Sequence, residues 1–343
     1  MHRNQQRSTD SEARRAAPHD ISWTIIVAAM LITFLACVGM PVTAMAVSST
    51  PNQNTWVTNG AVEAVVTDGT TTYIGGSFDY VGPNTGYGVP LDASSGSPQS
   101  PYPKVNGVVK AVVSDGSGGW YIGGEFTRVG DIARNRIAHI LSDGTVDSSW
   151  DPNADEAVYA LALNGSILYA GGAFTSIAGQ WRYYIAAIDT VTGQLTTWNP
   201  GADEAVNTLA VSGTTVYAGG DFTSIGGELR NQIGAIEAAT GFATGWDPSA
   251  DGPVYTLAVS GLRVYAGGNF TSIGGYPRNH IAAIDASTGD PTAWDPNANA
   301  NVYTLVVSGT TVYAGGFFTS IGGEWRNYIA EISIATGDAT DWD

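Results

Sequence analysis

One repeat length constrains this chain more than any other feature of its sequence. Gly-Gly pairs recur at an interval of 48 residues, beginning at Gly75, Gly123, Gly171, Gly219, Gly267 and Gly315. Tryptophans follow the same interval, at Trp150, Trp198, Trp246, Trp294 and Trp342, with Tyr102 at the equivalent earlier position. A fixed period of roughly 20 to 50 residues indicates a solenoid, a propeller or a repeat array. Six units account for nearly all of the chain after residue 46, so no second domain is expected.

The unit that begins at Ala205 contains four candidate strands, at residues 206–211, 215–222, 232–237 and 242–246. Apolar and polar residues alternate, and Gly, Ser and Thr mark the turns, which is typical of antiparallel strands. Four short strands in one repeat match the size of a propeller blade. We therefore predict an all-β fold, a six-bladed β-propeller of four-stranded blades over residues 47–343. An open β-solenoid or a tandem sandwich is the alternative.

The ends of the repeat array suggest how the ring closes. Trp56 resembles the end of a fourth strand that precedes the first unit, and Trp342 ends the last unit. If the two segments share one blade, residues 52–57 lie beside the last blade and no open sheet edge remains there. The alternative is that the chain is a fragment of a protein with more blades.

The first 46 residues differ from the rest. Four arginines (Arg3, Arg7, Arg14 and Arg15) precede an apolar run at residues 21–39 and the sequence Ala44-Met45-Ala46. This order predicts a signal peptide cleaved after Ala46. The alternative is an uncleaved signal-anchor helix, because the run is just long enough to span a bilayer. Both interpretations place residues 47–343 outside the cytoplasm, so the protein is expected to be secreted or held at the cell surface.

Charge and sulfur content exclude several function classes. The net charge of −17 argues against binding to nucleic acid or to an anionic membrane surface, since both need clustered Lys and Arg. The membrane is expected to be a partner only through the N-terminal segment, if that segment stays uncleaved. The single Cys, Cys37, and all four Met lie in the first 46 residues. The repeats therefore have no disulfide, no Cys-based metal site and no thiol nucleophile.

The repeats resemble a known bacterial family. The shared pattern is close to Asn-Pro-x-Ala-Asp-x-x-Val-x-x-Leu-Ala-Val, followed by Gly-Gly-x-Phe-Thr-Ser-Ile-Gly-Gly-x-x-Arg-Asn-x-Ile-Ala, over about residues 54–343. This pattern is similar to the delta-sixty repeat, a β-propeller domain of unknown function in secreted and surface proteins. The resemblance implies a propeller and export, and it carries no catalytic residues. The first unit departs from the pattern at Tyr80–Gly88.

Long polar loops are expected on one face of the propeller, where the second and third strands and consecutive units are joined. Binding residues concentrate on loops held by a rigid scaffold. Candidate ligand-binding residues on these loops are Trp181, Arg182, Tyr184, Arg230, Arg278, His280, Trp325, Arg326 and Tyr328. Two interpretations of the arginines stay open: each pairs with a nearby Asp or loop carbonyl, or together they face an anionic or sugar ligand. Trp181 and Trp325 are candidates for stacking on sugar rings, whereas the tryptophans that recur in every unit are expected to pack between blades.

The loops between units also resemble calcium loops. Candidate ligands are Asp151, Asn153 and Asp155 in one loop, and Asp247, Ser249 and Asp251 in another. Calcium requires about six or more oxygen ligands, and neither loop has the Glu that commonly completes such a site. The competing interpretation is a turn in which the Asp side chain caps its own backbone. Calcium is the only cofactor that the sequence suggests.

No enzyme motif stands out, and no catalytic residue is assigned. The repeats contain two histidines, His139 and His280, in separate units. The first hypothesis is an exported, non-enzymatic propeller that serves as a protein-interaction or structural scaffold. The alternative is a carbohydrate-binding, lectin-like propeller whose partner is an extracellular polysaccharide. The second alternative is a propeller glycoside hydrolase or lyase, which requires converging carboxylates.

Overall fold

The computed structural model describes residues 58, 60–67, 71–78, 87–99 and 102–342. The leader and the segment 52–57 lie outside the described residues. So do residues 79–86, which include most of the Tyr80–Gly88 segment that departs from the repeat pattern. The described part contains six three-stranded antiparallel sheets. No helix in this part is long and apolar enough to cross a membrane.

Each sheet is built from one repeat unit. The sheets are β1 (Val62–Thr67), β2 (Thr71–Gly76) and β3 (Gly88–Asp92); β4 (Val109–Ser114), β5 (Trp120–Gly124) and β8 (Ile137–Ile140); β9 (Val158–Asn164), β10 (Ile167–Gly172) and β13 (Ile185–Asp189); β14 (Val206–Ser212), β15 (Thr215–Gly220) and β18 (Ile233–Glu237); β19 (Val254–Ser260), β20 (Arg263–Gly268) and β23 (Ile281–Asp285); β24 (Val302–Ser308), β25 (Thr311–Gly316) and β28 (Ile329–Ser333). We number them sheets 1 to 6 in chain order.

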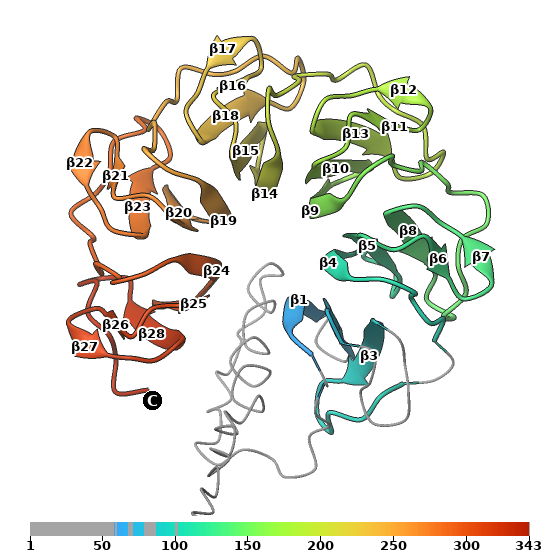
Figure 1. Ribbon diagram of the computed structural model, residues 1–343, viewed down its shortest axis with the longest axis horizontal. Coiled ribbons are helices and arrows are strands. Elements are labelled where there is room, and N and C mark those ends of the chain that lie inside the picture. Colours follow the sequence, from blue (N-terminus) through green and yellow to red (C-terminus); the bar gives the residue numbers. More distant parts are fainter. Residues whose placement is uncertain (1–57, 59, 68–70, 79–86, 100–101, 343) are drawn as a thin grey trace, which may run out of the picture.

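The sheets are arranged around a central axis, as in a propeller (Figure 1). The first strand of each sheet lies innermost, and successive inner strands pack side by side from β1 to β24. Sheet 1 and sheet 6 form the two ends of the arc (Figure 1). The all-β, propeller-like fold predicted from the repeat is confirmed.

The prediction of four strands in each blade is wrong for the described sheets. In sheet 4, the expected fourth strand at 242–246 makes a single bridge, between Ile236 and Ala243. The chain then leaves the sheet, because Arg230 donates to the carbonyl of Thr244 and the amide of Trp246 donates to the Thr244 hydroxyl. Side chains thus take the hydrogen-bonding groups that a fourth strand would use.

A small hairpin occupies the loop between the second and third strands. These hairpins are β6 (Arg128–Val129) with β7 (Ile132–Ala133), β11 (Ser176–Ile177) with β12 (Gln180–Trp181), β16 (Ser224–Ile225) with β17 (Glu228–Leu229), β21 (Ser272–Ile273) with β22 (Tyr276–Pro277), and β26 (Ser320–Ile321) with β27 (Glu324–Trp325). They lie at the outer rim (Figure 1). Four of the inter-unit loops form a β-bridge with the hairpin that follows, as Ala202 does with Ile225. The two long loops therefore share one face, as predicted.

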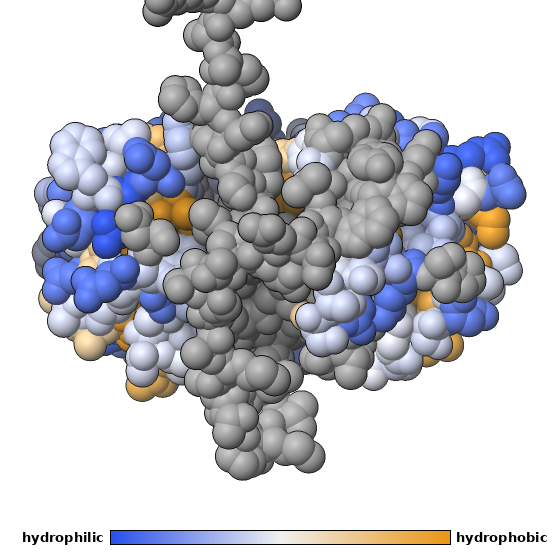
Figure 2. All heavy atoms as spheres, turned by 90° about the horizontal axis from the view of Figure 1, so that it is seen from below, coloured by the Kyte–Doolittle hydropathy of each residue, from blue (hydrophilic) through white to orange (hydrophobic). Residues whose placement is uncertain are grey.

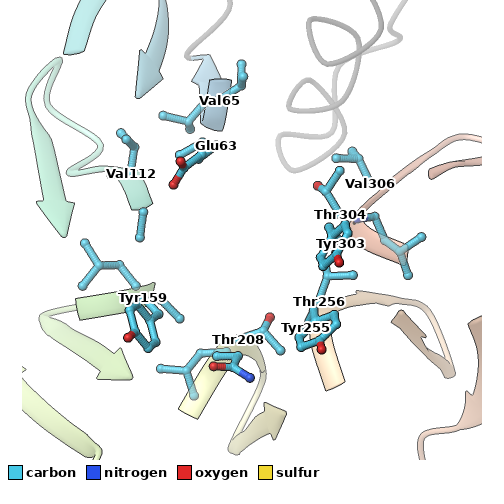
Figure 3. Close-up of a pocket in the computed structure, with 18 residues that line it drawn as sticks. Glu63, Val65, Val112, Tyr159, Thr208, Tyr255, Thr256, Tyr303, Thr304 and Val306 are labelled. Carbon is cyan, nitrogen blue, oxygen red and sulfur yellow. Dashed lines mark hydrogen bonds between the residues drawn. The ribbon is translucent and has the colours of Figure 1, made fainter. Parts of the chain in front are cut away.

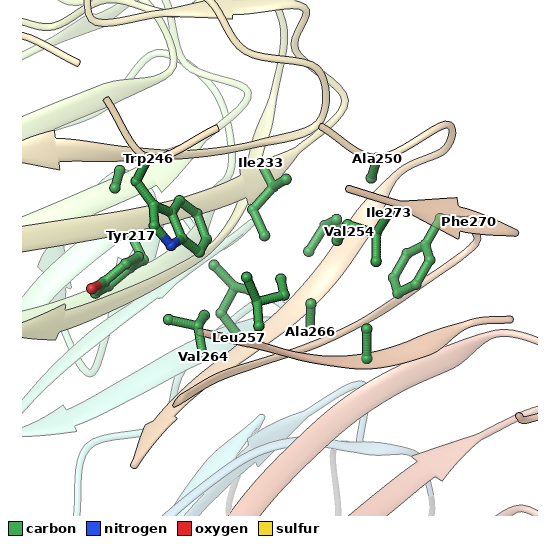
Figure 4. Packing of buried hydrophobic residues seen from close by; sticks show 13 residues of the cluster. Tyr217, Ile233, Trp246, Ala250, Val254, Leu257, Val264, Ala266, Phe270 and Ile273 are labelled. Carbon is green, nitrogen blue, oxygen red and sulfur yellow. The ribbon is translucent and has the colours of Figure 1, made fainter. Parts of the chain in front are cut away.

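The hydrophobic core lies between the sheets. One cluster joins Tyr217, Ile233 and Trp246 of unit 4 to Val254 and Phe270 of unit 5 (Figure 4). The Trp246 indole also donates to the carbonyl of Asp285 in unit 5, at 2.9 Å. Trp150, Trp198 and Trp294 make the same bond to the following unit. The recurring tryptophans therefore pack between units, as expected.

The first glycine of the first five pairs allows this close packing. A Cβ atom on Gly219 would lie 2.6 Å from Val254 Cγ1 and 2.8 Å from Thr208 Cγ2. Contacts this short are not tolerated in folded proteins, so any larger residue would push sheet 5 away from sheet 4. The glycine that recurs every 48 residues is therefore the residue at which one sheet contacts the next.

We expect Phe222→Ala to lower the free energy of unfolding by about 3–5 kcal/mol, because this fully buried ring would leave a cavity in the core. The matched control is Phe242→Ala in the same unit, whose ring is 68% exposed and whose loss should cost less than about 0.5 kcal/mol. Denaturant unfolding measures both. Equal effects would contradict the packing described for unit 4.

Candidate functional site

Every inner strand contains a β-bulge near its start. In sheet 4, Val206 pairs with Gly220 and Thr208 pairs with Gly219, so Asn207 is the extra residue. The same shift occurs in the other five sheets. A bulge re-aims one side chain and often lies beside a functional site. The second glycine of the pair permits it, since a Cβ atom on Gly220 would collide with the Ala205 carbonyl.

The six bulge residues are of four types although their surroundings repeat. We call them the bulge ring: Glu63, Lys110, Tyr159, Asn207, Tyr255 and Tyr303. The preceding residue is Val in all six units. Five of the six residues of the bulge ring line a cavity of about 270 Å³ at the centre of the molecule, together with neighbouring residues of all six inner strands. Lys110 is the one bulge residue whose neighbours, and not itself, line that cavity.

A second variable position lies directly after each Gly-Gly pair. These residues, which we call the mouth ring, are Ser77, Glu125, Ala173, Asp221, Asn269 and Phe317. The two rings touch within a unit: Asn207 Nδ2 donates to Asp221 at 3.3 Å, and the rings of Tyr303 and Phe317 meet edge to face at 5.0 Å. Ser77 donates to Glu63, and Asn269 hydrogen-bonds Tyr255. These contacts join the bulge ring and the mouth ring, and we call the two rings together the channel mouth.

The channel mouth has a charged side and an aromatic side. Lys110 Nζ lies 2.9 Å from Glu63 Oε2 and 3.8 Å from Glu125 Oε1. Across the cavity (Figure 3), Tyr255 and Tyr303 stack with ring centroids 5.2 Å apart. Phe317 is 68% exposed and Tyr303 is 41% exposed. The aromatic side therefore offers ring surface to a ligand.

Two tyrosines of the channel mouth, Tyr159 and Tyr255, remain protonated at neutral pH. Burial raises the pKa of Tyr159, and the negative charges of Glu125, Glu156 and Asp221 add to the rise. Burial also raises the pKa of Tyr255, with the neighbouring Tyr303 and Asp221 adding to it. Both phenols can donate hydrogen bonds to a ligand.

The predicted arginines hold their own loops. Arg182, Arg230, Arg278 and Arg326 each donate to the preceding residue's carbonyl and to a threonine carbonyl 14 residues later. Arg230 and Arg278 also lie 3.7 and 3.6 Å from Asp247 and Asp295. These contacts are the ones expected if each arginine pairs with a nearby Asp or loop carbonyl. Whether a ligand also reaches them stays a prediction.

The two predicted sugar-stacking tryptophans lie far apart. Trp181 on β12 is 67% exposed and Trp325 on β27 is 79% exposed, and these strands lie at distant points of the rim (Figure 1). Tyr184, His280 and Tyr328 precede the third strand with positive φ. His280 Nδ1 lies 3.3 Å from the Gly268 carbonyl oxygen. Seen from the side, the molecule carries separated hydrophobic patches on a largely hydrophilic surface (Figure 2).

All six predicted calcium ligands are already bonded to the protein. Asp151 and Asp247 pair with Arg134 and Arg230. Asn153 accepts from the Asn135 amide, and Ser249 accepts from Asn231. Asp155 and Asp251 accept from the next hairpin; Asp251 binds the Thr271 and Ser272 amides at 2.8 and 2.9 Å. Within the described ranges, no group of three or more His, Asp or Glu side chains could hold a metal ion.

These Asp side chains act at long range, across units. The competing interpretation placed the capped amides within the same loop, but Asp251 caps amides 20 and 21 residues later. Asp155 and Asp203 make the equivalent bonds, and Asn299 replaces them in the last loop. Partial burial alone would raise the pKa of Asp155, Asp203 and Asp251, but hydrogen bonds from Thr and Ser outweigh it and lower the pKa.

A second ionisable cluster lies inside unit 2, among the core residues. His139 is buried, with its ring nitrogens 3.0 Å from Asp147 and 3.1 Å from Asp115, and it stacks on Tyr121 at 4.3 Å. Units 3, 4 and 5 have alanine at the position of His139: Ala187, Ala235 and Ala283. The cluster is closed by protein contacts on both nitrogens, which fits a structural role.

The two rings at the channel mouth are not among the residues that the sequence pattern predicted. The signal was present: between a constant Val and a residue that is always Ala or Thr, one strand residue varies among Glu, Lys, Asn and Tyr. Strand alternation alone does not single out this residue, because the bulge that turns it toward the mouth arises from pairing with the Gly-Gly strand.

Comparison with known proteins supports the fold. Residues 116–149 match a family described as a β-propeller domain of unknown function, DUF5122. No curated protein matches the sequence. The WD40 β-propeller domain of Doa1 is similar in structure, with a TM-score of 0.58, 13% identity and 84% coverage of each chain. The computationally designed Ika8 protein has a TM-score of 0.48 and 16% identity, covering 82% of this chain and 86% of its own. The similarity to the WD40 domain concerns the fold alone.

We expect Asp251→Ala to lower the free energy of unfolding by about 1–2 kcal/mol, because two hairpin amides and one hydroxyl lose their acceptor. Asp251→Asn is the matched control and should cost less, since Asn299 accepts the same two amides in the last loop. Denaturant unfolding at neutral pH measures the difference. Equal losses in the two variants would contradict the capping role.

The pH dependence provides a second readout for the same variants. The pKa of Asp251 is lower in the folded protein than in the unfolded chain, so its stabilisation is complete above about pH 5 and falls as the pH is lowered through 4 and below. Asp251→Asn should therefore lose less stability between pH 7 and pH 3 than the unmodified protein. An unchanged loss would contradict the assignment.

Proposed function

We propose that this protein is an exported, non-enzymatic β-propeller that serves as an interaction scaffold and binds its partner at the channel mouth. One observation carries the proposal: six bulges on a repeated frame carry side chains of four types, and five of the six line one cavity. A rigid scaffold with variable residues gathered at one opening is suited to recognition.

The carboxylates of the channel mouth already have ion-pair or hydrogen-bond partners, which favours binding over catalysis. Glu63 and Glu125 both face Lys110, and Asp221 accepts from Asn207. A glycoside hydrolase needs one carboxyl with a raised pKa and a second that is free to attack or to activate water. The carboxylates of the mouth are instead held by cationic or amide partners.

Membership of the delta-sixty repeat family and export belong to the same proposal. The long repeat motif supports the first, together with the match of residues 116–149 to a β-propeller domain family. The basic and apolar segments of residues 1–46 support the second. We propose that residues 47–343 work outside the cytoplasm, either free or attached through an uncleaved leader.

We further propose that sheet 6 closes against sheet 1 to complete six blades. Tyr265 and Ile281 of sheet 5 are buried by sheet 6, whereas their equivalents Tyr313 and Ile329 are only half-buried. Thr208 and Thr256 hydroxyls accept from the amides of Leu257 and Leu305 on the next inner strand. Thr304 holds the same position in sheet 6, and Val65 of sheet 1 is the equivalent of those leucines.

A pair of cysteines tests the closure. In a Cys37→Ser background, Thr304→Cys with Val65→Cys should form a disulfide under mild oxidation, because the two positions face each other in a closed ring. Thr256→Cys with Leu305→Cys is the matched control at a junction that the structure describes. Cross-linking of the control pair alone, measured by mass spectrometry, would show that the ring is open.

The binding function is tested with the full chain on arrays of envelope proteins and of polysaccharides from the organism that makes it. We expect a retained partner whose mass is unchanged after incubation. Lys110→Ala and Asn207→Ala should weaken retention about tenfold or more, since each removes a polar contact at the mouth. Leu262→Ser, at an exposed turn on the opposite face, is the control.

Two results would overturn this proposal. Release of cleaved or modified partner would show catalysis. Loss of binding in Leu262→Ser, with full binding in both mouth variants, would place the interaction on the opposite face.

A further inference from the structure

The aromatic side of the channel mouth differs from the rest of the opening. Tyr255, Tyr303 and Phe317, which we call the aromatic arc, form a continuous set of rings: Tyr255 stacks on Tyr303 with an interplanar angle of 20°, and Phe317 meets Tyr303 at 79°. Exposed fractions of 41% for Tyr303 and 68% for Phe317 leave ring surface uncovered beside the cavity. The corresponding positions in units 1, 2 and 4 are charged or polar, so the arc is not a requirement of the fold.

Hydrogen-bonding groups surround the arc. Asn301 donates to the Tyr303 hydroxyl at 3.2 Å, Asn269 hydrogen-bonds Tyr255, and Asn207 with Asp221 lies on the adjoining unit. Amides and phenols both donate and accept, and a carboxylate accepts. A sugar presents the matching surface, because its hydroxyls need donors and acceptors while its C–H face packs on an aromatic ring.

Charge narrows the class of sugar. The charge of Lys110 is matched by Glu63 and Glu125, and Asp221 adds a further carboxylate. The whole chain carries a net charge of −17. A sulfated or carboxylated glycan would therefore meet repulsion at the mouth, and an uncharged glycan would not.

A peptide fits the arc less well. Peptides often bind by adding a strand to an open sheet edge. On the inner edges beside the arc, the amides of Leu257 and Leu305 already donate to Thr208 and Thr256 at 3.0 and 3.2 Å. These amides are not available to a peptide strand.

We propose that the aromatic arc binds an uncharged oligosaccharide chain, with sugar rings stacked on Phe317 and Tyr303 and hydroxyls bonded to Asn269, Asn207 and Asp221. This inference rests on the proposed binding function and names the class of partner. It moves the sugar contact from the rim tryptophans to the channel mouth.

Calorimetry and array binding with the full chain test the inference. The probes are uncharged cello-, malto- and chito-oligosaccharides, an anionic oligosaccharide (oligogalacturonate) and a cationic peptide (oligolysine). We expect binding of at least one uncharged series and none of the anionic one. Phe317→Ala and Tyr303→Ala should weaken that binding about tenfold each, whereas Tyr303→Phe should keep most of it.

Exposed aromatic residues elsewhere supply the controls. Trp181→Ala and Trp325→Ala remove rings on the rim and should leave the affinity unchanged. Because Phe317 is exposed, its variant should keep the unfolding temperature of the unmodified protein, which separates lost contact from lost folding.

The inference would be overturned if no uncharged oligosaccharide bound, or if oligolysine alone bound. It would also be overturned if binding survived both Phe317→Ala and Tyr303→Ala, or if only the rim variants lost binding. A protein partner lost on mouth substitution would overturn the sugar assignment and leave the proposed binding function standing. Cleavage of the oligosaccharide would contradict the proposed function itself.

Discussion

The packing of each sheet on the next is the interaction on which the structure depends. A three-stranded sheet of one unit has two apolar faces and cannot bury either alone. Tyr217 and Trp246 cover the face of one sheet, Val254 and Phe270 supply the facing surface of the next, and Gly219 allows their backbones to approach. Stability in such an array is a sum of junctions, so a residue at a junction matters more than one on the rim.

The same glycine pair that permits the packing also creates the candidate site. Its first member makes room for the neighbouring valine, and its second faces the bulge that turns Asn207 and its equivalents to the mouth. A bulge residue is released from the core, so its identity can vary without cost to the fold. This separation explains how a nearly uniform array presents glutamate, lysine, asparagine and tyrosine around one opening.

Polar side chains of the long loops hydrogen-bond backbone groups that a full fourth strand would otherwise pair or cover. Arg230 takes the carbonyl of Thr244, and Asp251 takes two amides of the next hairpin. The sequence marked both residues as candidates for ligand or calcium binding. Their bonds show that each joins segments far apart in the chain, which repetition in the sequence does not reveal.

The sequence by itself determined the repeat, the all-β class, the propeller-like arrangement and the packing role of the recurring tryptophans, because these follow from local periodicity repeated in every unit. The tertiary structure alone decided that the fourth strand shrinks to one bridge, that Asp251 caps a hairpin of the following unit, and that Tyr255, Tyr303 and Phe317 meet at one opening. These outcomes depend on which groups of neighbouring units come within hydrogen-bonding or packing distance. That distance is set by the twist and register of whole sheets, and a linear pattern does not contain it.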